Sequence, residues 1–271
     1  MSTAALVASV LVLGMLAYGW FEAGWLRTTV LELPLAGLPA ALDGLRITHL
    51  SDLHLGAPLS RGNRAGARAA KWAAGRKPDL ICITGDLVSH PRGEPRLREI
   101  LALLDDPVVV LGNHDVAVTR DPFSRAAELR DLEATSLLGD GQETRVLRNE
   151  PVSIVGVSPE TFRTGAPTPH ELIAPGATLR LLLCHYPDIA RRIPPGSFDL
   201  ILTGHLHAGQ ICLPLVGRRV ALAHPRATLI AGRYDTPAGT MHVSPGTGTT
   251  FVPFRFFARP EVTELVLRRS D

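Results

Sequence analysis

Five short apolar runs along this chain each lead directly into residues of the types that commonly bind metal ions in proteins. The segments that follow these runs are Ser51–His54, Gly85–Asp86, Gly112–Asp115, His185 and Gly204–His207. In α/β proteins, ligands bind at the carboxyl ends of the strands, where loops leave the sheet. If each run is a buried strand, the five segments meet at one edge of the fold and form one polar cluster. No other feature of the chain constrains its fold as strongly.

The rest of the chain alternates strand-like and helix-like segments, which is typical of the α/β class. Apolar, often β-branched runs predict strands at Leu45–His49, Leu80–Thr84, Val108–Leu111, Val152–Val157, Leu181–Cys184, Leu200–Thr203 and Val262–Leu267. Amphipathic patterns predict helices at Arg64–Arg76, Pro95–Asp105 and Ser124–Glu133. From Gly209 onward the chain contains more Gly, Pro and strand-like pieces than helices.

The types of candidate ligand indicate the class of metal. The candidates are Asp52, His54, Asp86, Asn113, His185, His205 and His207. Carboxylate, imidazole and amide groups without a thiolate suit Mn²⁺, Fe or Zn²⁺. The set is too large for one tetrahedral zinc, but two ions ~3.5–4 Å apart that share a carboxylate would accommodate it. Such a pair polarises a phosphoryl oxygen and lowers the pKa of a water molecule toward ~7, which predicts hydrolysis of phosphoesters.

Each segment alone also has an ordinary explanation. A Gly-Asp pair after a strand is usually a turn, and a lone histidine such as His185 is usually a hydrogen-bonded surface or core residue. Gly112–Asp115 and Gly204–His207 are rarer patterns, but each alone could be a turn with solvated histidines. All five segments in order, each after a buried-strand pattern, favour one metal site over five unrelated turns.

The order Asp-x-His, Gly-Asp, Gly-Asn-His-Asp, His and Gly-His-x-His resembles that of the calcineurin-like metallophosphoesterase superfamily. Within it, Leu42–Gly56 after a hydrophobic N-terminus resembles the membrane-anchored bacterial YaeI/YkuE-like phosphodiesterase branch, as do His185–Asp188 and Gly204–Gln210. The resemblance implies a metallophosphoesterase fold, which is a two-sheet β-sandwich flanked by helices. The metals would lie at the strand ends on one edge of it.

The resemblance also implies roles for individual residues. One ion would be held by Asp52, His54, Asp86 and His207, and the second by Asp86, Asn113, His185 and His205. His114 matches the catalytic histidine, which contacts the phosphate or protonates the leaving oxygen, and Asp115 matches an acidic position that orients it. A histidine also suits this task chemically, because its pKa lies near neutrality.

Two segments depart from the pattern of this branch. Leu206 and Ala208 replace the usual Thr and Gly of the last motif, and Ser244–Thr249 lacks the usual Arg of a neighbouring loop. Neither change removes a metal ligand. The missing Arg changes how a phosphate would be positioned, so the substrate of the branch does not transfer directly to this chain.

The N-terminal segment predicts a membrane anchor. Ala4–Phe21 contains no charged residue and is long enough to cross a hydrocarbon core of ~30 Å at ~1.5 Å per residue. We expect an uncleaved anchor over 1–27 and one catalytic domain over 28–271. A signal peptide and a core helix are the alternatives, but no Lys or Arg precedes the run and no A-x-A-like cleavage site is evident. The resemblance implies the bacterial inner membrane, and Arg27 favours a cytoplasmic domain.

The composition excludes some classes of function and leaves others open. A formal net charge of +2 is too small to indicate a nucleic-acid partner. The leading hypothesis is hydrolysis of a phosphodiester or pyrophosphate on a membrane-associated substrate. Relatives elsewhere in the superfamily hydrolyse UDP-2,3-diacylglucosamine, which makes a lipid of that type a candidate. The alternatives are a phosphomonoesterase or phosphoprotein phosphatase, and a membrane-tethered scaffold without catalysis.

Several other polar residues and the cysteines have structural explanations. His49 lies within a predicted strand and is expected to be a packed, hydrogen-bonded core residue. Surface positions are expected for His90, His170, His224 and His242. Arg61, Arg64, Arg68 and Lys71 are expected to form a solvated helix face, with an anionic headgroup as the alternative partner. The three cysteines lack paired spacing and are expected to be buried thiols, while the resemblance places Gln210 at the mouth of the pocket.

Overall fold

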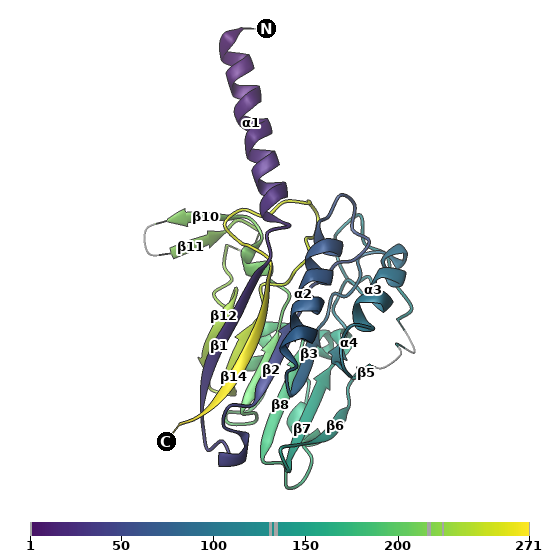
Figure 1. Ribbon diagram of the computed structural model, residues 1–271, viewed down its shortest axis with the longest axis vertical. Helices are drawn as coiled ribbons and strands as arrows, with labels where there is room; N and C mark the ends of the chain where they lie inside the picture. The colour runs from purple at the N-terminus through teal and green to yellow at the C-terminus, as the bar shows by residue number, and fades with distance from the viewer. Residues whose placement is uncertain (1, 130–131, 133–134, 216–217, 224, 271) are drawn as a thin grey trace.

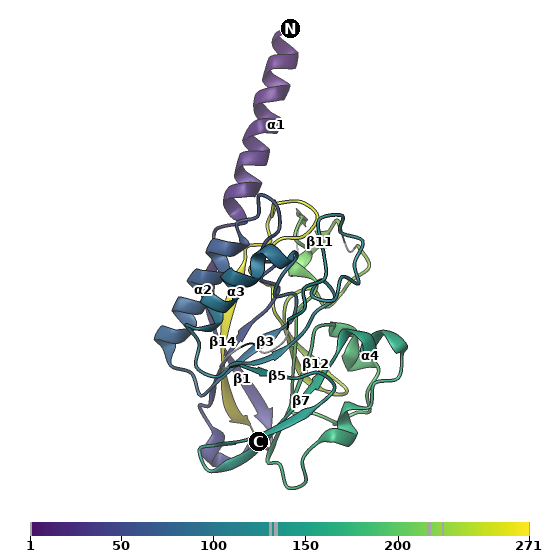
Figure 2. The same cartoon turned by 90° about the vertical axis from the view of Figure 1, so that its right-hand side faces the viewer.

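Two six-stranded sheets pack face to face in the computed structural model, which describes residues 2–129, 132, 135–215, 218–223 and 225–270. Helices cover the outer faces (Figures 1 and 2). The first sheet has the order β1 (Arg27–Ala36), β14 (Glu261–Ser270), β2 (Arg46–Leu50), β3 (Leu80–Thr84), β4 (Val108–Val110) and β5 (Ser136–Leu137). Strands β2 to β5 are parallel, while β14 runs antiparallel to β2.

The second sheet has the order β12 (Gly232–Thr236), β13 (Gly239–Val243), β9 (Leu200–Thr203), β8 (Leu179–Cys184), β7 (Glu150–Val157) and β6 (Gln142–Leu147). Its four inner strands are parallel. A separate hairpin joins β10 (Cys212–Leu215) to β11 (Arg218–Ala221). Parallel strands end at the same edge, so both sheets bring several strand ends to one end of the domain.

The alternation of side chains along buried strands explains the layers. In β3, Leu80 and Cys82 point into the core between the sheets, while Ile81 and Ile83 point toward the helices outside. In β8, Leu181 and Leu183 enter the core between the sheets. Because both faces of these strands are covered, their sequences read as continuous apolar runs.

Two helices cover the outer face of the first sheet. These are α2 (Gly62–Arg76) and α3 (Glu94–Leu101), which contribute alanines and leucines to the outer core. The outer face of the second sheet is covered by α4 (Pro159–Thr164) and by short 3₁₀ helices. These are η3 (Pro169–Leu172) and η4 (Pro187–Arg191), while η1 (Ala40–Leu42), η2 (Pro91–Gly93) and η5 (His207–Gly209) lie elsewhere in the domain.

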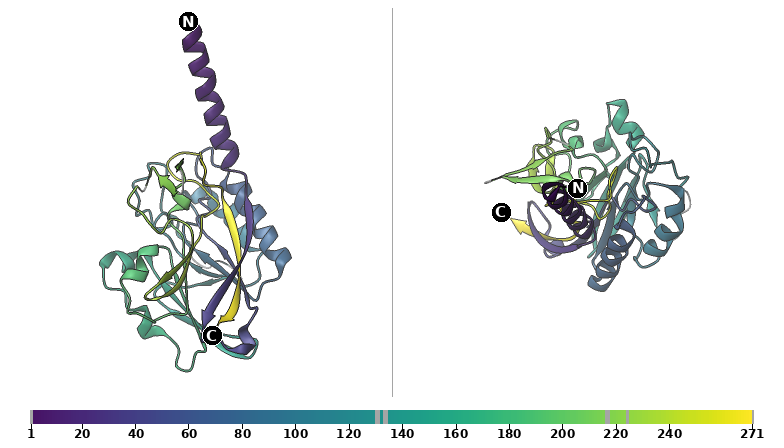
Figure 3. Two further views of the ribbon diagram at one scale, coloured as in Figure 1. Left: turned by 90° about the vertical axis from the view of Figure 1, so that its left-hand side faces the viewer. Right: turned by 90° about the horizontal axis from the view of Figure 1, so that it is seen from above.

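The N-terminal helix α1 (Thr3–Glu22) projects from the domain (Figures 1 and 3). It is apolar on all sides, with a mean hydropathy of 2.0, and only 6% of its most apolar window is buried. Its length and composition make it a candidate membrane span, whereas a core helix would be covered by the domain. The core-helix alternative is therefore wrong.

The prediction of an α/β fold with two sheets and flanking helices is confirmed, and the seven predicted strands correspond to β2, β3, β4, β7, β8, β9 and β14. The predicted helix Pro95–Asp105 ends earlier, at Leu101. The predicted helix Ser124–Glu133 is wrong over 124–129, while 130–131 and 133 lie outside the described residues. Arg125 and Ala127 donate their backbone N–H groups to Ser89 and Asp115 rather than along a helix.

Candidate metal centre

The predicted ligands converge at the end of the domain from which α1 projects. Asp52 and His54 follow β2, Asp86 follows β3, and Asn113 follows β4. From the second sheet, His185 follows β8, while His205 and His207 follow β9. All of these residues are buried except His205, which is half-buried. The expectation that five strand ends form one cluster is confirmed.

One group of four residues could hold a metal ion. The donor atoms of Asp52, His54, Asp86 and His207 lie within 4.8 Å of one another. The Nε2 atom of His54 lies 3.0 Å from Nε2 of His207 and 3.4 Å from Oδ2 of Asp86. The Nε2 atom of His207 lies 3.4 Å from Oδ1 of Asp52.

A second group shares Asp86 with the first and adds His185 and His205. The Nε2 atom of His185 lies 3.2 Å from Oδ2 of Asp86 and 3.1 Å from Nδ1 of His205. Asn113 places Oδ1 3.1 Å from the same nitrogen of His185. Oδ2 of Asp86 faces both groups, so this oxygen would be shared if each group held an ion.

The spacing of these atoms fits divalent metal ions. Two ligands ~2.1 Å from one ion are separated by ~3.0–3.4 Å in octahedral or tetrahedral geometry, which is the spacing of the donor atoms above. In two of the histidine rings, the nitrogen that faces away from the site also has a hydrogen-bond partner. The Nδ1 atom of His54 lies 2.8 Å from Oγ of Ser89, and Nδ1 of His185 lies 2.9 Å from the Thr84 carbonyl oxygen. A donating Nδ1–H leaves Nε2 with a lone pair directed at the site.

Burial and neighbouring charges set the protonation of the site. Burial holds the pKa of His54 and His207 well below its usual value, and the positive charge of Arg255 lowers both further. These rings are therefore neutral and able to bind metal. Burial also lowers the pKa of His185, but Asp86 and Asp52 outweigh it and raise that pKa to about 9. A proton and a metal ion would compete for the same nitrogen of His185.

The backbone at the site adopts conformations that most residues avoid. Asp52, His54, Asp86, His205 and His207 all have positive φ angles, between 46° and 77°. Such left-handed conformations cost free energy in non-glycine residues and are concentrated at functional sites. Five candidate ligands adopt this unfavourable conformation, which supports a functional rather than a packing role for them.

Two glycines make room for the ligands. A Cβ atom on Gly112 would collide with the carboxylate of Asp86, and one on Gly204 would collide with Ser51 and Asp52. The glycines of the Gly-Asn-His-Asp and Gly-His-Leu-His motifs are therefore needed for close approach to the carboxylates.

Residues 45–209 match the family model described as calcineurin-like phosphoesterase. The match includes every candidate ligand and more than half of the chain.

The chain belongs to the calcineurin-like phosphoesterase family.

Curated relatives agree with this assignment and with the predicted branch. The chain is 26% identical to the uncharacterized metallophosphoesterase YkuE of Bacillus subtilis, over 86% of this chain and 82% of the relative. It is 29% identical to the phosphodiesterase YaeI of Escherichia coli, over 82% of each chain. It is 26% identical to the UDP-2,3-diacylglucosamine pyrophosphatase LpxG of Chlamydia trachomatis, over 82% of this chain and 83% of that one.

In this family member, His114 lies beside the metal groups without belonging to either. Its ring centroid is 4.6 Å from that of His54, and the two rings are almost perpendicular. Its Nε2 atom lies 3.2 Å from Oγ1 of Thr119 and 3.4 Å from Oγ1 of Thr250. Its buried Nδ1 atom has no hydrogen-bond partner.

Asp115 contacts the backbone of the phosphoesterase site rather than the ring of His114. Its carboxylate accepts hydrogen bonds from the backbone N–H groups of Val88, at 2.9 Å, and Gly112, at 2.8 Å. Burial and the negative charge of Asp86 together raise the pKa of this carboxyl to about 7, against the hydrogen bonds from Gly112 and Val88. Asp115 thereby shapes the loop that carries His114, and its catalytic role stays a prediction.

One buried residue near the phosphoesterase centre was not predicted from the sequence. Arg255 is fully buried and donates hydrogen bonds to the carbonyl oxygens of Pro245, Gly248 and Ala258. Its Nη1 atom also lies 3.3 Å from the carbonyl oxygen of His207. A lone Arg between Phe254 and Phe256, in an apolar run, was the signal that could have identified it.

The remaining histidine predictions have mixed outcomes. His49 is buried as expected, with Nδ1 2.8 Å from Nδ1 of His242 and Nε2 2.8 Å from Oγ1 of Thr84. His242 is also buried, so its predicted surface position is wrong. It lies on β13 of the second sheet and packs against His49 of the first, which the spacing along the sequence does not reveal. His224 lies outside the described residues, and the three cysteines are buried and free as predicted.

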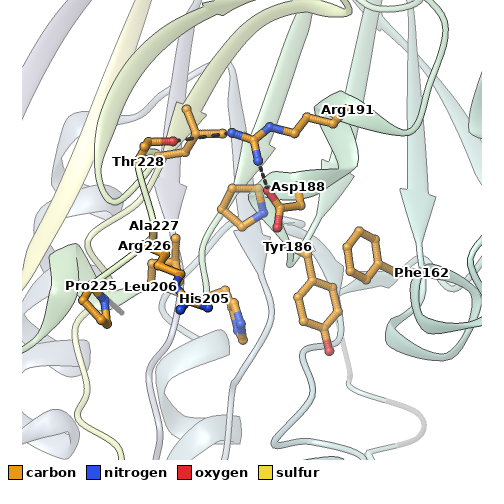
Figure 4. Close-up of a pocket in the computed structure, with 12 residues that line it drawn as sticks. Phe162, Tyr186, Asp188, Arg191, His205, Leu206, Pro225, Arg226, Ala227 and Thr228 are labelled. Carbon is orange, nitrogen blue, oxygen red and sulfur yellow. Dashed lines mark hydrogen bonds and ion pairs between the residues drawn. The ribbon is translucent and has the colours of Figure 1, made fainter. Parts of the chain in front are cut away.

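Two cavities flank the segment that carries the last two ligands of the phosphoesterase site. A cavity of about 590 Å³ is lined by His205, Leu206, the aromatic rings of Tyr186 and Phe162, and arginines that include Arg226 (Figure 4). The two rings are stacked, with centroids 4.2 Å apart. A cavity of about 680 Å³ adjoins His207 and is lined mainly by apolar groups. The residues that line it include Leu206, Ile211, Leu222, Phe251, Val252 and, as expected, Gln210.

Proposed function

We propose that this phosphoesterase hydrolyses a phosphodiester or pyrophosphate on a membrane-associated substrate, with two divalent metal ions, Mn, Fe or Zn, at the strand ends. One ion would be held by Asp52, His54, Asp86 and His207. The other would be held by Asp86, Asn113, His185 and His205. When bound, the ions would polarise a phosphoryl oxygen and stabilise the charge that develops around phosphorus.

His114 is the proposed acid for the leaving oxygen. Its ring lies against His54, so it is next to the metal groups without belonging to either of them. Its Nε2 atom lies near the hydroxyl groups of Thr119 and Thr250, and its buried Nδ1 atom has no hydrogen-bond partner. Asp115 supports this role through the loop backbone.

The two cavities are our reason to favour a substrate with two different substituents on its phosphate. Leu206 lines both cavities, while His205 lines the polar, aromatic one and His207 the apolar one. A diester or pyrophosphate has a group on each side of the scissile bond, whereas a monoester has only one. A polar headgroup on the His205 side and an apolar chain on the His207 side would occupy both cavities.

The apolar cavity and α1 together favour a lipid. The name of the relative LpxG identifies UDP-2,3-diacylglucosamine as its substrate, and a lipid of that type would match a polar and an apolar cavity. α1 would hold the enzyme in the bilayer as a single-pass anchor, which raises the local concentration of such a substrate. We place the anchor in the bacterial inner membrane, with the catalytic domain on the cytoplasmic side because of Arg27.

The alternatives predict different results. A phosphomonoesterase or phosphoprotein phosphatase would use the same metals but would not need two cavities of opposite character. A membrane-tethered scaffold would not need a complete ligand set, and all seven predicted ligands lie together at the site.

The test is hydrolysis by the full chain in detergent, reconstituted with Mn²⁺. Rates on bis(p-nitrophenyl) phosphate and p-nitrophenyl phosphate are compared, with Asp86→Asn as control. A preference for the diester that the variant loses supports the proposal, and UDP-2,3-diacylglucosamine would be the next substrate. A preference for the monoester favours the phosphatase. Equal rates for wild type and variant on both substrates would contradict hydrolysis at this centre.

A further inference from the structure

Large apolar side chains are exposed around the foot of α1. We call them the apolar collar, and its members are Leu59, Phe123, Leu213, Leu222, Phe251 and Phe257, each 45% or more exposed. They come from loops that follow β2, β4 and β13 and from the β10–β11 hairpin and its exit. Figure 1 shows this hairpin at the end of the domain from which α1 projects. Apolar patches that bring together distant segments of a chain mark interaction surfaces.

The collar and the last turn of α1 are one packed unit. The indole N–H of Trp20 donates to the carbonyl oxygen of Leu59 at 3.2 Å. The ring of Tyr18 lies 6.5 Å from that of Phe257. The buried carboxylate of Glu22 accepts the backbone N–H of Ala258 at 2.7 Å. The direction of the helix therefore fixes the direction in which the collar faces.

The backbone at three collar residues adds to the cost of exposing them to water. Leu59, Phe251 and Phe257 have φ angles of 56°, 58° and 54°, in the left-handed region that favours glycine. In water, Gly or Asn at these positions would avoid both the strain and the exposed apolar surface. A bulky apolar side chain is favoured there only if the surface is covered by an apolar medium.

Aromatic and basic side chains next to the collar are of the types found at the membrane interface. Trp20 and Trp25 are both partly exposed, and each has an arginine over its ring. Arg61 lies 4.2 Å from the ring centre of Trp20, and Arg259 lies 3.9 Å from that of Trp25. Indole rings and arginines with buried stems are typical of the headgroup region.

The apolar cavity opens within the collar. Leu222 and Phe251 belong to both, and Val252 is a further exposed apolar residue of the cavity. His207, a candidate metal ligand, lines the inner part of the same cavity and is 3% exposed. A path of apolar side chains therefore runs from the outer face of the collar to the metal groups.

We propose that the apolar collar is a membrane-contact surface, inserted in the headgroup region of the bilayer that α1 crosses, so that the cavity beside His207 opens directly on the lipid. This inference rests on the proposed anchoring by α1. It deepens the proposed function, because the apolar part of the substrate would then enter from the bilayer and not from water.

The test measures the depth of single labels on the full chain in lipid vesicles. The native cysteines are buried, so a polarity-sensitive thiol dye would label an introduced cysteine. Leu59→Cys, Leu213→Cys and Phe257→Cys place the dye on the collar. Val146→Cys is the matched control, because Val146 is 71% exposed on β6 and pairs with Pro151 at the start of β7, far from the strand ends that carry the candidate ligands. Vesicle flotation is measured first on every labelled chain.

Insertion by ~5–10 Å predicts that brominated lipids remove about half or more of the collar fluorescence and leave the Val146 dye unchanged. If the chain floats with the vesicles but the collar dyes are quenched no more than the control, the collar proposal is overturned and the anchor stands. Disulfide cross-links between two copies, formed when the unlabelled collar cysteine variants are oxidised in vesicles, together with collar dyes that are not quenched, would also overturn it. A chain that does not float overturns the anchor and the collar together, while hydrolysis in detergent tests the enzyme separately.

Discussion

The guanidinium of Arg255 donates a hydrogen bond to the backbone carbonyl oxygen of His207, with 3.3 Å between Nη1 and the oxygen. The backbone N–H of the same arginine donates to the carbonyl oxygen of Gly19 in α1 at 3.0 Å. Arg255 thus links the last turn of the anchor helix to a candidate metal ligand. Burial lowers its pKa to about 10, which leaves it charged at neutral pH.

We expect Arg255→Gln to weaken metal binding and lower the rate of hydrolysis. The shorter Gln side chain cannot contact all the carbonyl oxygens of His207 and the 245–248 loop that Arg255 binds. His207 therefore loses its fixed position. Loss of such supporting contacts costs ~10–100-fold in metal affinity or activity. Metal affinity by calorimetry is compared with Arg259→Gln, whose parent side chain contacts Trp25 and Leu26 outside the site. A folded Arg255 variant with normal metal affinity would refute this positioning role.

Asp86→Asn is expected to weaken the binding of both metal ions, since Oδ2 of Asp86 lies 3.2–3.4 Å from a histidine nitrogen of each ligand group. Asn retains the size of the side chain but not the charge that a bridging ligand needs. The matched variant Asp52→Asn should weaken the binding of only one ion, because Asp52 belongs to only one ligand group. Metal content per chain by mass spectrometry separates the two cases. Equal losses in both variants would contradict a bridge at Asp86.

The strands and the site were predictable for the same reason. Runs such as Leu80–Thr84 are apolar because both faces of the strand are covered, and the polar residue that follows each run marks the strand end. The order of motifs then placed Asp52 and His207 in one site although they are far apart along the chain. The bridging position of Asp86 followed from the resemblance alone and needed the structure to show which oxygen faces both groups.

What the sequence did not reveal depends on contacts between distant segments. Arg255 and His242 are buried by packing that no local pattern records. The segment 124–129 has helix-like periodicity because Leu129 packs on the outer core, but the N–H groups of Arg125 and Ala127 bond to other loops. The exposure of the apolar residues Phe251 and Phe257 around α1 has no local signal in the sequence either.

His114→Ala is expected to lower the rate of diester hydrolysis by ~10²–10⁴-fold while the metal content stays near that of wild type. His114 lies outside both metal groups, so its removal leaves their donor atoms in place. A leaving group that needs no proton, such as p-nitrophenolate, should be affected less than an alkoxide. If His114→Ala loses the metals, the ring is a ligand and its assignment as the acid is wrong.

The buried pair His49 and His242 should make stability depend on pH. Burial lowers the pKa of His242 to about 4, and burial and its neighbour lower that of His49 well below its usual value. In the unfolded chain both titrate near ~6.5, so below that pH the unfolded state binds protons that the folded state excludes. Stability is therefore full above ~6.5 and falls as the pH decreases toward the folded pKa, by ~1.4 kcal/mol per pH unit for each histidine.

His242→Asn separates the contribution of His242 to this pH dependence from that of His49. The amide replaces the contact of Nδ1 with His49 at 2.8 Å but does not titrate, so the slope between pH 6.5 and pH 4.5 should decrease by ~1.4 kcal/mol per pH unit. The measurement is urea unfolding of the full chain in detergent at several pH values in this window. The other histidines are common to both proteins, so their contributions cancel in the difference. Identical slopes would mean that His242 is protonated in the folded chain, and that the two rings do not form a neutral pair.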